Sequence, residues 1–134
     1  MDHHTSLTEK VIGCAIEVHR NLGPGLLEAI YETCLCHELT LAGINFVRQQ
    51  KLPVLYKGEP VDCDLKIDIV VEQSLVLEVK AVQQVLSLHE AQLLTYLRVS
   101  GLSLGLLLNF NEVTMKQGIR RRYLSNSAAL SNPA

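Results

Sequence analysis

Three residues in two neighbouring apolar segments, Asp68, Glu78 and Lys80, have the types and spacing needed to hold a metal ion and to activate water. Glu78 and Lys80 are two residues apart, so in a β-strand both side chains project from the same face. On such a face the carboxylate can hold a divalent cation while the lysine orients or deprotonates an attacking water molecule. The pattern indicates metal-assisted hydrolysis, and an opposed aspartate makes it more specific than Glu-x-Lys alone.

The register of the two segments determines whether the acidic residues meet. Apolar residues alternate with polar ones and share one face of each segment, at Leu65, Ile67, Ile69 and Val71 in the first and at Leu75, Leu77, Val79 and Ala81 in the second. Because the two apolar faces must coincide, a three-residue loop at 72–74 pairs Ile69 with Leu77 and Ile67 with Val79. The same register places Asp68 directly opposite Glu78.

Two carboxylates that face each other across a sheet repel, and this destabilises the strand pair unless a cation compensates. The sequence leaves two compensations open. Lys66 and Lys80 could neutralise Asp68 and Glu78 diagonally in a cluster of ion pairs. Alternatively, a hard divalent cation could bind both carboxylates.

The segment 87–99 has helical periodicity, and Ser87 with Glu90 fits the S/T-x-x-E capping box that begins many helices. His89 followed by Glu90 suggests the zinc-protease motif H-E-x-x-H, but Leu93 occupies the place of the second histidine. That motif is therefore excluded. A position at the boundary between core and solvent is the simpler account of His89.

The remaining elements follow from the spacing of apolar residues and from turn residues such as those at 23–25 and 57–60. The expected helices cover residues 7–22, 26–41 and 87–99, and the expected strands cover residues 45–56, 62–71, 75–82, 102–110 and 118–124. The order α-α-β-β-β-α-β-β predicts an α/β or α+β fold in which helices pack against one central sheet.

A length of 134 residues fits one domain, which we expect over residues 1–124, followed by a small, polar and disordered tail at 125–134.

Twelve Lys and Arg against 14 Asp and Glu give a net charge of −2, which argues against tight, sequence-blind binding to nucleic acid. The one basic run, Arg120, Arg121 and Arg122, is either a solvated strand end or a patch that contacts phosphate.

The four cysteines form no C-x-x-C pair, and their apolar or alternating surroundings predict buried free thiols at Cys14, Cys34, Cys36 and Cys63. The sequence has no basic-then-apolar segment at its start and no apolar stretch long enough to span a membrane. We therefore expect a cytoplasmic protein that does not bind membranes.

Three blocks of the sequence resemble the GxxExxY protein family, which is placed within the PD-(D/E)XK nuclease-like superfamily. Gly25, Glu28 and Tyr31 stand at the spacing in the family's name, and Asp68 with Glu78 and Lys80 resembles the superfamily core, although isoleucine precedes Asp68 where the superfamily's name has proline. The third block is H-x-A-Q-L-L-x-Y-L at residues 89–97, followed by the strand segment GLLLNFN at 105–111; it also resembles the Q-x-x-x-Y element of RecB-type nucleases. The likeness covers roughly residues 8–124.

The resemblance implies a restriction-endonuclease-like core, with a mixed central sheet flanked by helices, and cleavage of phosphodiester bonds. It implies that Asp68 and Glu78 are metal ligands and that Lys80 is the catalytic lysine. It also adds Glu28 as a further acidic ligand and Gln92 as a catalytic residue beside Tyr96.

Two functions follow as hypotheses. The first is a Mg²⁺- or Mn²⁺-dependent nuclease, with DNA favoured over RNA, whose metal is held by Asp68, Glu78, the Val79 carbonyl and Glu28. In this hypothesis substrate contacts come from Tyr96, His89, Arg120 and Arg121. The alternative is a non-catalytic nucleic-acid- or protein-binding module that retains the fold, and a homodimer is compatible with either function.

Overall fold

The computed structural model of the protein describes residues 3–125. Its helices are α1 (His3–Leu22), α2 (Glu28–Leu41) and α3 (Ser87–Ser100), with a short 3₁₀ helix η1 (Met115–Gly118). Its strands are β1 (Phe46–Lys51), β2 (Val54–Tyr56), β3 (Glu59–Val61), β4 (Lys66–Val71), β5 (Leu75–Lys80), β6 (Leu104–Asn109) and β7 (Ile119–Tyr123). The mixed α and β composition confirms the predicted fold class.

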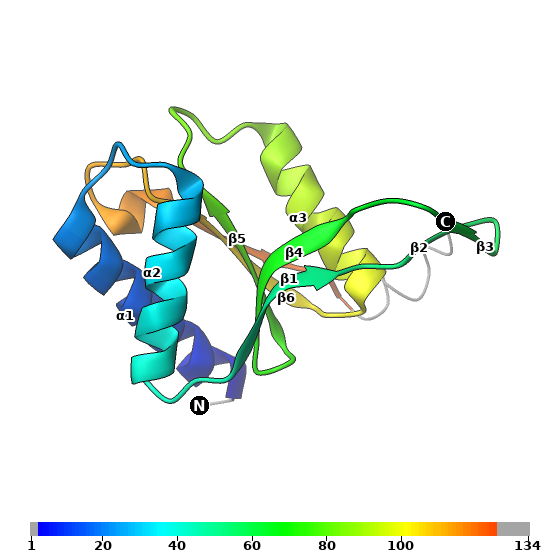
Figure 1. Ribbon diagram of the computed structural model, residues 1–134, viewed down its shortest axis with the longest axis horizontal. Coiled ribbons are helices and arrows are strands. Elements are labelled where there is room, and N and C mark those ends of the chain that lie inside the picture. Colours follow the sequence, from blue (N-terminus) through cyan, green and yellow to red (C-terminus); the bar gives the residue numbers. More distant parts are fainter. Residues whose placement is uncertain (1–2, 126–134) are drawn as a thin grey trace.

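Five strands form the central sheet in the order β1-β4-β5-β6-β7. All neighbouring pairs are antiparallel except β5 and β6, which are parallel and are connected through α3. Helices α1 and α2 lie on one side of the sheet and α3 lies on the other (Figure 1). This three-layer arrangement buries β5 and β6 in the centre of the protein, since all six residues of β6 are buried.

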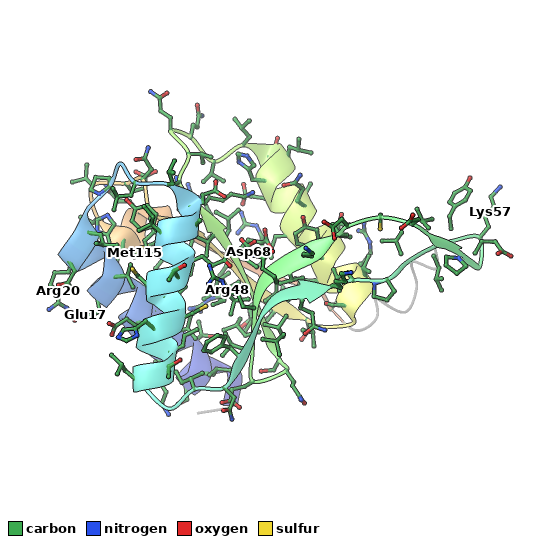
Figure 2. All side chains as sticks on the ribbon, in the orientation of Figure 1. Glu17, Arg20, Arg48, Lys57, Asp68 and Met115 are labelled. Carbon is green, nitrogen blue, oxygen red and sulfur yellow. The ribbon has the colours of Figure 1, made fainter. Side chains whose placement is uncertain are left out.

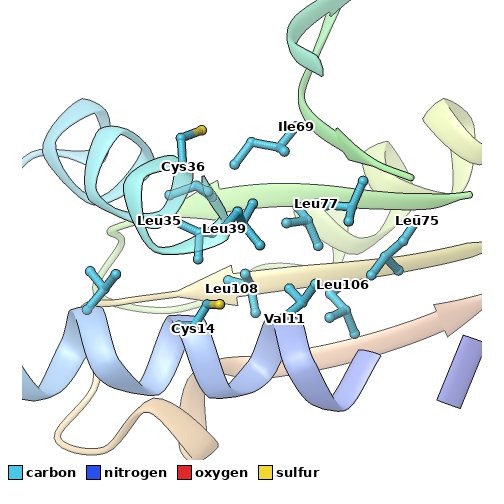
Figure 3. Packing of buried hydrophobic residues seen from close by; sticks show 14 of the residues in the cluster. Val11, Cys14, Leu35, Cys36, Leu39, Ile69, Leu75, Leu77, Leu106 and Leu108 are labelled. Atoms are coloured by element: carbon cyan, nitrogen blue, oxygen red, sulfur yellow. The ribbon is translucent and has the colours of Figure 1, made fainter. Parts of the chain in front are cut away.

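Each face of the sheet has its own aliphatic core. The first core joins the sheet to α1 and α2, where Val11, Leu35 and Leu39 pack against Leu77 and Leu108 (Figure 3). The second core joins the sheet to α3 and contains Leu52, Ile67, Val70, Val76, Leu93, Leu97 and Leu107. Burial on both faces explains why the central strands carry nearly continuous apolar runs.

The five predicted strands are all present, but the segment 45–56 is divided. Pro53 lies between β1 and β2, because proline lacks the N–H that a continuous strand would need. β2 then pairs with β3 in a separate two-stranded hairpin that extends away from the sheet (Figure 1). The strand expected from residue 62 accordingly begins only at Lys66.

The turn between β4 and β5 confirms the predicted register. Residues 72–74 form a three-residue turn, and Ile69 pairs with Leu77 as expected. The predicted pair of Ile67 and Val79 is absent from the described ladder, which ends at Ile69 and Leu77, and these two side chains pack in different cores. Glu72 and Gln73 both have positive φ angles, of 50° and 54°, and the Ser74 N–H donates to the Val71 carbonyl at 2.9 Å. The tight turn therefore determines which residues of β4 and β5 lie opposite each other.

One part of the facing prediction is wrong. Ile69 and Val71 pack in the first core as expected, but Leu65 and Ile67 pack in the second core, on the opposite side of the sheet. The side chains of Leu65 and Ile67 therefore point to the side of the sheet opposite to those of Ile69 and Val71, and the change occurs at Asp68. The neighbouring strand changes at the same place: Gln49 of β1 has a φ angle of 55°, and the β1–β4 ladder is interrupted between Gln49 and Asp68.

The cysteines only partly follow the prediction. All four are free, and Cys14 and Cys36 are buried, which raises the pKa of both thiols. Cys34 is half-buried and Cys63 is exposed, so the prediction of burial is wrong for Cys63. The reason is that Cys63 follows the projecting β2–β3 hairpin, where no core is available to cover it.

None of the helices within residues 3–125 is long and apolar enough to cross a bilayer. The predicted disordered tail lies outside the described residues from position 126 onward.

Candidate functional site

The strands β4 and β5 separate next to the predicted acidic pair. Their backbone ladder ends at Ile69 and Leu77, and the next position of the same register brings Asp68 and Glu78 opposite each other. Side chains replace the ladder bonds there: Asp68 Oδ2 accepts the Val79 N–H at 2.8 Å, and Glu78 Oε1 accepts the Asp68 N–H at 3.4 Å. The opening in the ladder is thus held by the two carboxylates themselves.

Both carboxylates are in surroundings that disfavour their charge. Glu78 is only 6% exposed, and burial, followed by the negative charge of Asp68, raises the pKa of Glu78 to about 8. Burial also raises the pKa of Asp68, against the opposing effect of the hydrogen bond from the Val79 N–H. Desolvation and mutual repulsion therefore make this pair a place where a cation would be strongly favoured.

The lysines do not form the predicted cluster of ion pairs. Lys66 contacts Asp64 at 3.4 Å, an exposed residue outside the site. Lys80 makes no ion pair within the described residues, although its charge lowers the pKa of both Asp68 and Glu78. Lys80 thus lies near the acids with its ammonium group unpaired. The described structure therefore lacks the cluster of ion pairs in which Lys66 and Lys80 would neutralise Asp68 and Glu78.

The segment that begins α2 is built around Tyr31. This fully buried side chain donates through its hydroxyl to the Gly23 carbonyl at 2.6 Å and accepts the Leu26 N–H at 3.0 Å. Its ring stacks on Phe110 with centroids 4.7 Å apart. Gly25 has a φ angle of 104°, which favours glycine, so the Gly and Tyr of G-x-x-E-x-x-Y act together to fix the start of the helix.

Fixing the helix start in this way places Glu28 at the end of β5. Glu28 is the first residue of α2, and its Oε2 accepts the Ala81 N–H at 3.4 Å, directly after Lys80. The Glu28 side chain is exposed, unlike Glu78. Residues from three separate parts of the sequence, Glu28, Asp68 and Glu78, are therefore brought to one end of the β4–β5 pair.

Sequence reasoning missed Glu32, which lies one turn after Glu28 and is 7% exposed. Glu32 Oε2 accepts from Arg48 Nε at 2.6 Å, and Gln49 Nε2 donates to both Glu32 oxygens at 2.9 and 3.1 Å. The charge of Glu32 contributes to the raised pKa of Asp68. Figure 2 shows Arg48 and Asp68 close together in the region between α2 and α3. The spacing of Glu28 and Glu32 on one helix face was the available signal.

Helix α3 contributes Tyr96 to the opposite side of the site. Tyr96 is half-buried, and its pKa is raised by burial and then by the charges of Glu78 and Asp68. Gln92 lies one turn earlier on the same helix and is exposed. The structure therefore brings Tyr96 beside the acids and leaves Gln92 at the solvent side of the helix.

His89 has a local role that differs from the predicted capping box. Its Nδ1 accepts the Leu86 N–H at 2.9 Å, so the residue that precedes the helix is Leu86. The prediction that Ser87 and Glu90 form the capping pair is wrong, because the imidazole satisfies this N–H and Glu90 pairs with Arg122 of β7.

The strand register separates the predicted arginines. Glu78 is opposite Leu107, and Leu107 is opposite Arg120, so these three residues form one row across the sheet. Two strand spacings put the Cα atoms of Arg120 and Glu78 roughly 10 Å apart. Both residues belong to the face of the sheet that α3 covers. Arg121 is opposite Leu106, whose side chain packs in the first core, so Arg121 belongs to the other face of the sheet and is not brought to the site.

A buried amide that the sequence did not single out holds the end of β5. Asn109 is fully buried, its Oδ1 accepts the Val82 N–H and its Nδ2 donates to the Val82 carbonyl, both at 3.0 Å. The Phe110 N–H also donates to the Lys80 carbonyl at 2.8 Å. These bonds fix the backbone on both sides of Ala81, and hence the backbone at Lys80.

A family model described as the PD-(D/E)XK nuclease superfamily matches residues 5–122. The chain belongs to the PD-(D/E)XK nuclease superfamily. No curated protein and no solved structure matches the chain. The match confirms the predicted superfamily, whereas the finer assignments to the GxxExxY family and to a RecB-type element stay predictions.

Members of the PD-(D/E)XK superfamily generally use divalent metals and act on nucleic acid. Within residues 3–125, no three His, Cys, Asp or Glu side chains gather closely enough to form a ready-made metal site. The donor set nevertheless fits a hard cation. Asp68 and Glu78 supply adjacent carboxylates whose charges are poorly compensated, and oxygen is the ligand atom that Mg²⁺ prefers, often from only one or two carboxylates with water completing the shell.

A large groove of the described structure lies elsewhere. A groove of about 740 Å³ runs between β1 and the end of α3, with Phe46, Leu52, Val99 and Leu102 among its lining residues. None of the site residues predicted for this PD-(D/E)XK protein lines it. The candidate site is therefore the opening between β4 and β5, and not this groove.

Proposed function

We propose that the protein is a divalent-metal-dependent nuclease, with Mg²⁺ or Mn²⁺ as the metal and DNA as the preferred substrate. The observation that carries this proposal is the pair formed by buried Glu78 and half-buried Asp68, beside the unpaired ammonium group of Lys80. The burial costs stability in the metal-free protein, and such a cost is typical of functional sites. The preference for DNA rests on the resemblance to RecB-type nucleases.

In this proposal Asp68, Glu78, the Val79 carbonyl and Glu28 hold the metal. When bound, the metal polarises the scissile phosphate and lowers the pKa of a coordinated water molecule. Lys80 shares the face of Glu78, which suits a role in orienting or deprotonating that water. Tyr31, through the start of α2, positions Glu28 for its part in the site.

The substrate contacts in this proposal come from the α3 side of the sheet. Arg120 is in the same row as Glu78 and can approach a phosphate, while Tyr96 lines the site and Gln92 extends it toward solvent. His89 contributes indirectly, by holding the beginning of α3. The placement of Arg121 on the other face gives it the weakest support among the proposed substrate contacts.

The test is cleavage of single-stranded, duplex and branched DNA and of RNA, in Mg²⁺ or Mn²⁺. Lys80→Ala should lower the cleavage rate by at least about 10²-fold, which is the usual loss when a positioned proton-transfer group is removed. Lys66→Ala is the matched control, because Lys66 is also a β-strand lysine but pairs with Asp64 outside the site. Equal background activity of the unmodified protein and Lys80→Ala with every substrate and metal would rule out the nuclease.

The net charge of −2 favours one alternative, a non-catalytic binding module that retains the fold. Calorimetric titration with Mg²⁺ and Mn²⁺ separates the two functions. Absence of divalent binding, together with a gain of stability in Asp68→Asn through relief of repulsion with Glu78, would support the module.

A further inference from the structure

Gln49 has a backbone conformation that its residue type does not favour. Its φ angle of 55° lies in the left-handed region, which non-glycine residues adopt at a cost in energy. The adjacent residues of β1 remain paired with β4, with Arg48 opposite Ile69 and Gln50 opposite Ile67. The distortion is therefore confined to Gln49, directly beside Asp68, and requires compensating contacts.

Those contacts come from the carboxamide of Gln49. Its Nε2 donates to Glu32 Oε2 at 2.9 Å and to Glu32 Oε1 at 3.1 Å, and it lies 3.4 Å from Asp68 Oδ1. The amide nitrogen thus links an acid of α2 to an acid of β4. Without the left-handed residue, the alternation of side chains along β1 would direct this amide differently.

Glu32 is itself firmly held. Arg48 Nε donates to Glu32 Oε2 at 2.6 Å, and Arg48 Nη2 donates to Thr33 Oγ1 at 2.9 Å. Because Glu32 is buried and both of its oxygens are engaged by Gln49 or Arg48, it serves as an anchor for these donors. A charge-assisted contact of this kind is stronger and better oriented than a neutral one.

We propose that Gln49 is a positioning residue that sets the orientation of the Asp68 carboxylate for metal binding, an inference that rests on the proposed nuclease function. Gln49 contacts Asp68 Oδ1, while the Val79 N–H donates to Asp68 Oδ2. Both oxygens are therefore held from opposite sides. Contacts that orient a metal ligand commonly change metal affinity by 10–100-fold when they are removed.

The matched variants are Gln49→Asn and Gln50→Asn. Asparagine tolerates the left-handed region and keeps an amide, but it is one methylene shorter, so it cannot reach both Glu32 and Asp68. Gln50 is the next residue of the same strand, lines the groove beside β1, and makes no hydrogen bond to Glu32 or Asp68 among the described residues. Gln49→Gly is a second test variant, because it removes the side chain and also the backbone strain, which guards against a failure to fold.

The first measurement is amide hydrogen exchange in the metal-free protein. Because Asp68 accepts the Val79 N–H, release of Asp68 should make Val79 exchange about tenfold faster in Gln49→Asn and Gln49→Gly. Val76, in the paired part of β5, should be unchanged, and Gln50→Asn should change neither amide. Unchanged exchange at Val79, or equal acceleration at Val79 and Val76, would overturn the proposal, since the latter indicates general destabilisation.

The second measurement is Mn²⁺ affinity by electron paramagnetic resonance, with an expected loss of about tenfold in Gln49→Asn and none in Gln50→Asn. If Val79 responds as expected but Gln49→Asn binds Mn²⁺ as tightly as the unmodified protein, the metal-positioning role is overturned. If the unmodified protein binds no Mn²⁺ while Val79 responds, the proposed nuclease function fails and the hold of Gln49 on Asp68 is still supported.

Discussion

At the scale of single residues, Glu78 is the residue through which this site most lowers the stability of the metal-free protein. A carboxyl group that is 6% exposed and faces Asp68 keeps its proton to an unusually high pH, with a pKa of about 8 against an ordinary 4.5. Between these two values the folded protein binds a proton that the unfolded chain has released. Stability therefore falls as pH rises through this interval, and the dependence ends above pH 8.

We accordingly expect the metal-free protein to be less stable at pH 8.5 than at pH 5. A shift from 4.5 to about 8 corresponds to a loss on the order of 3–5 kcal/mol in the free energy of unfolding. Glu78→Gln should remove most of this slope, because the amide is neutral at both pH values. Urea denaturation at the two pH values, in the presence of a chelator, measures it.

The control for this prediction is Glu59→Gln, which changes an exposed glutamate of β3 and should keep the slope of the unmodified protein. A slope that is equally steep in Glu78→Gln would show that the pH dependence arises elsewhere.

At the scale of elements, the connection from β6 to η1 determines how the end of β5 is held. A Cβ atom added at Gly118 would lie 1.9 Å from the Asn109 carbonyl oxygen. That carbonyl cannot shift freely, because the Asn109 side chain is bonded to Val82 and the next N–H is bonded to Lys80. The glycine thus permits the close approach that keeps the backbone at Lys80 in place.

Gly118→Ala should therefore destabilise the protein by roughly 3 kcal/mol or more, at the upper end of the range for overpacking. Gly13→Ala provides the control: no atom lies within 4 Å of the added Cβ, and alanine favours helix α1, so stability should rise by about 0.5–1 kcal/mol. Thermal unfolding of both variants measures the difference. A Gly118→Ala protein as stable as the unmodified one would contradict the proposed rigidity of this connection.

The elements also show what the sequence could and could not predict. The position of Asp68 opposite Glu78 was predictable, because the alternation of apolar and polar residues and the short turn together determine which residues of the two strands face each other. The change of face at Asp68 was not, since it coincides with the left-handed Gln49 of a neighbouring strand, which the pattern of β4 does not report. Glu32 was missed although it lies one turn after Glu28, because its partners Arg48 and Gln49 lie 16 and 17 residues away and spacing along the helix does not identify such contacts.

At the scale of the whole molecule, the site is formed by helices and strands that are far apart in the sequence. Helix α2 contributes Glu28 and Glu32, the sheet contributes Asp68 and Glu78, and α3 contributes Tyr96 from the other side. A ligand held between these layers binds the folded protein and not the unfolded chain. Metal binding must therefore appear as a gain in the stability of the entire fold.

We expect Mg²⁺ or Mn²⁺ to raise the midpoint of thermal unfolding by about 5–10 °C at 100 times the dissociation constant, which corresponds to roughly 2.7 kcal/mol. At one fixed cation concentration, the gain should be larger at pH 8.5 than at pH 6, because a proton competes with the metal for Glu78 below its pKa of about 8. Scanning calorimetry at both pH values, with and without the cation, measures the effect.

The matched variants for this measurement are Asp68→Asn and Asp64→Asn. Asp68→Asn should lose the metal-dependent gain, because it removes one of the two opposed carboxylates. Asp64→Asn should retain it, because Asp64 is exposed and pairs with Lys66 outside the site. An equal gain in both variants would mean that the cation binds elsewhere on this protein of net charge −2, and that Asp68 and Glu78 face each other for another reason.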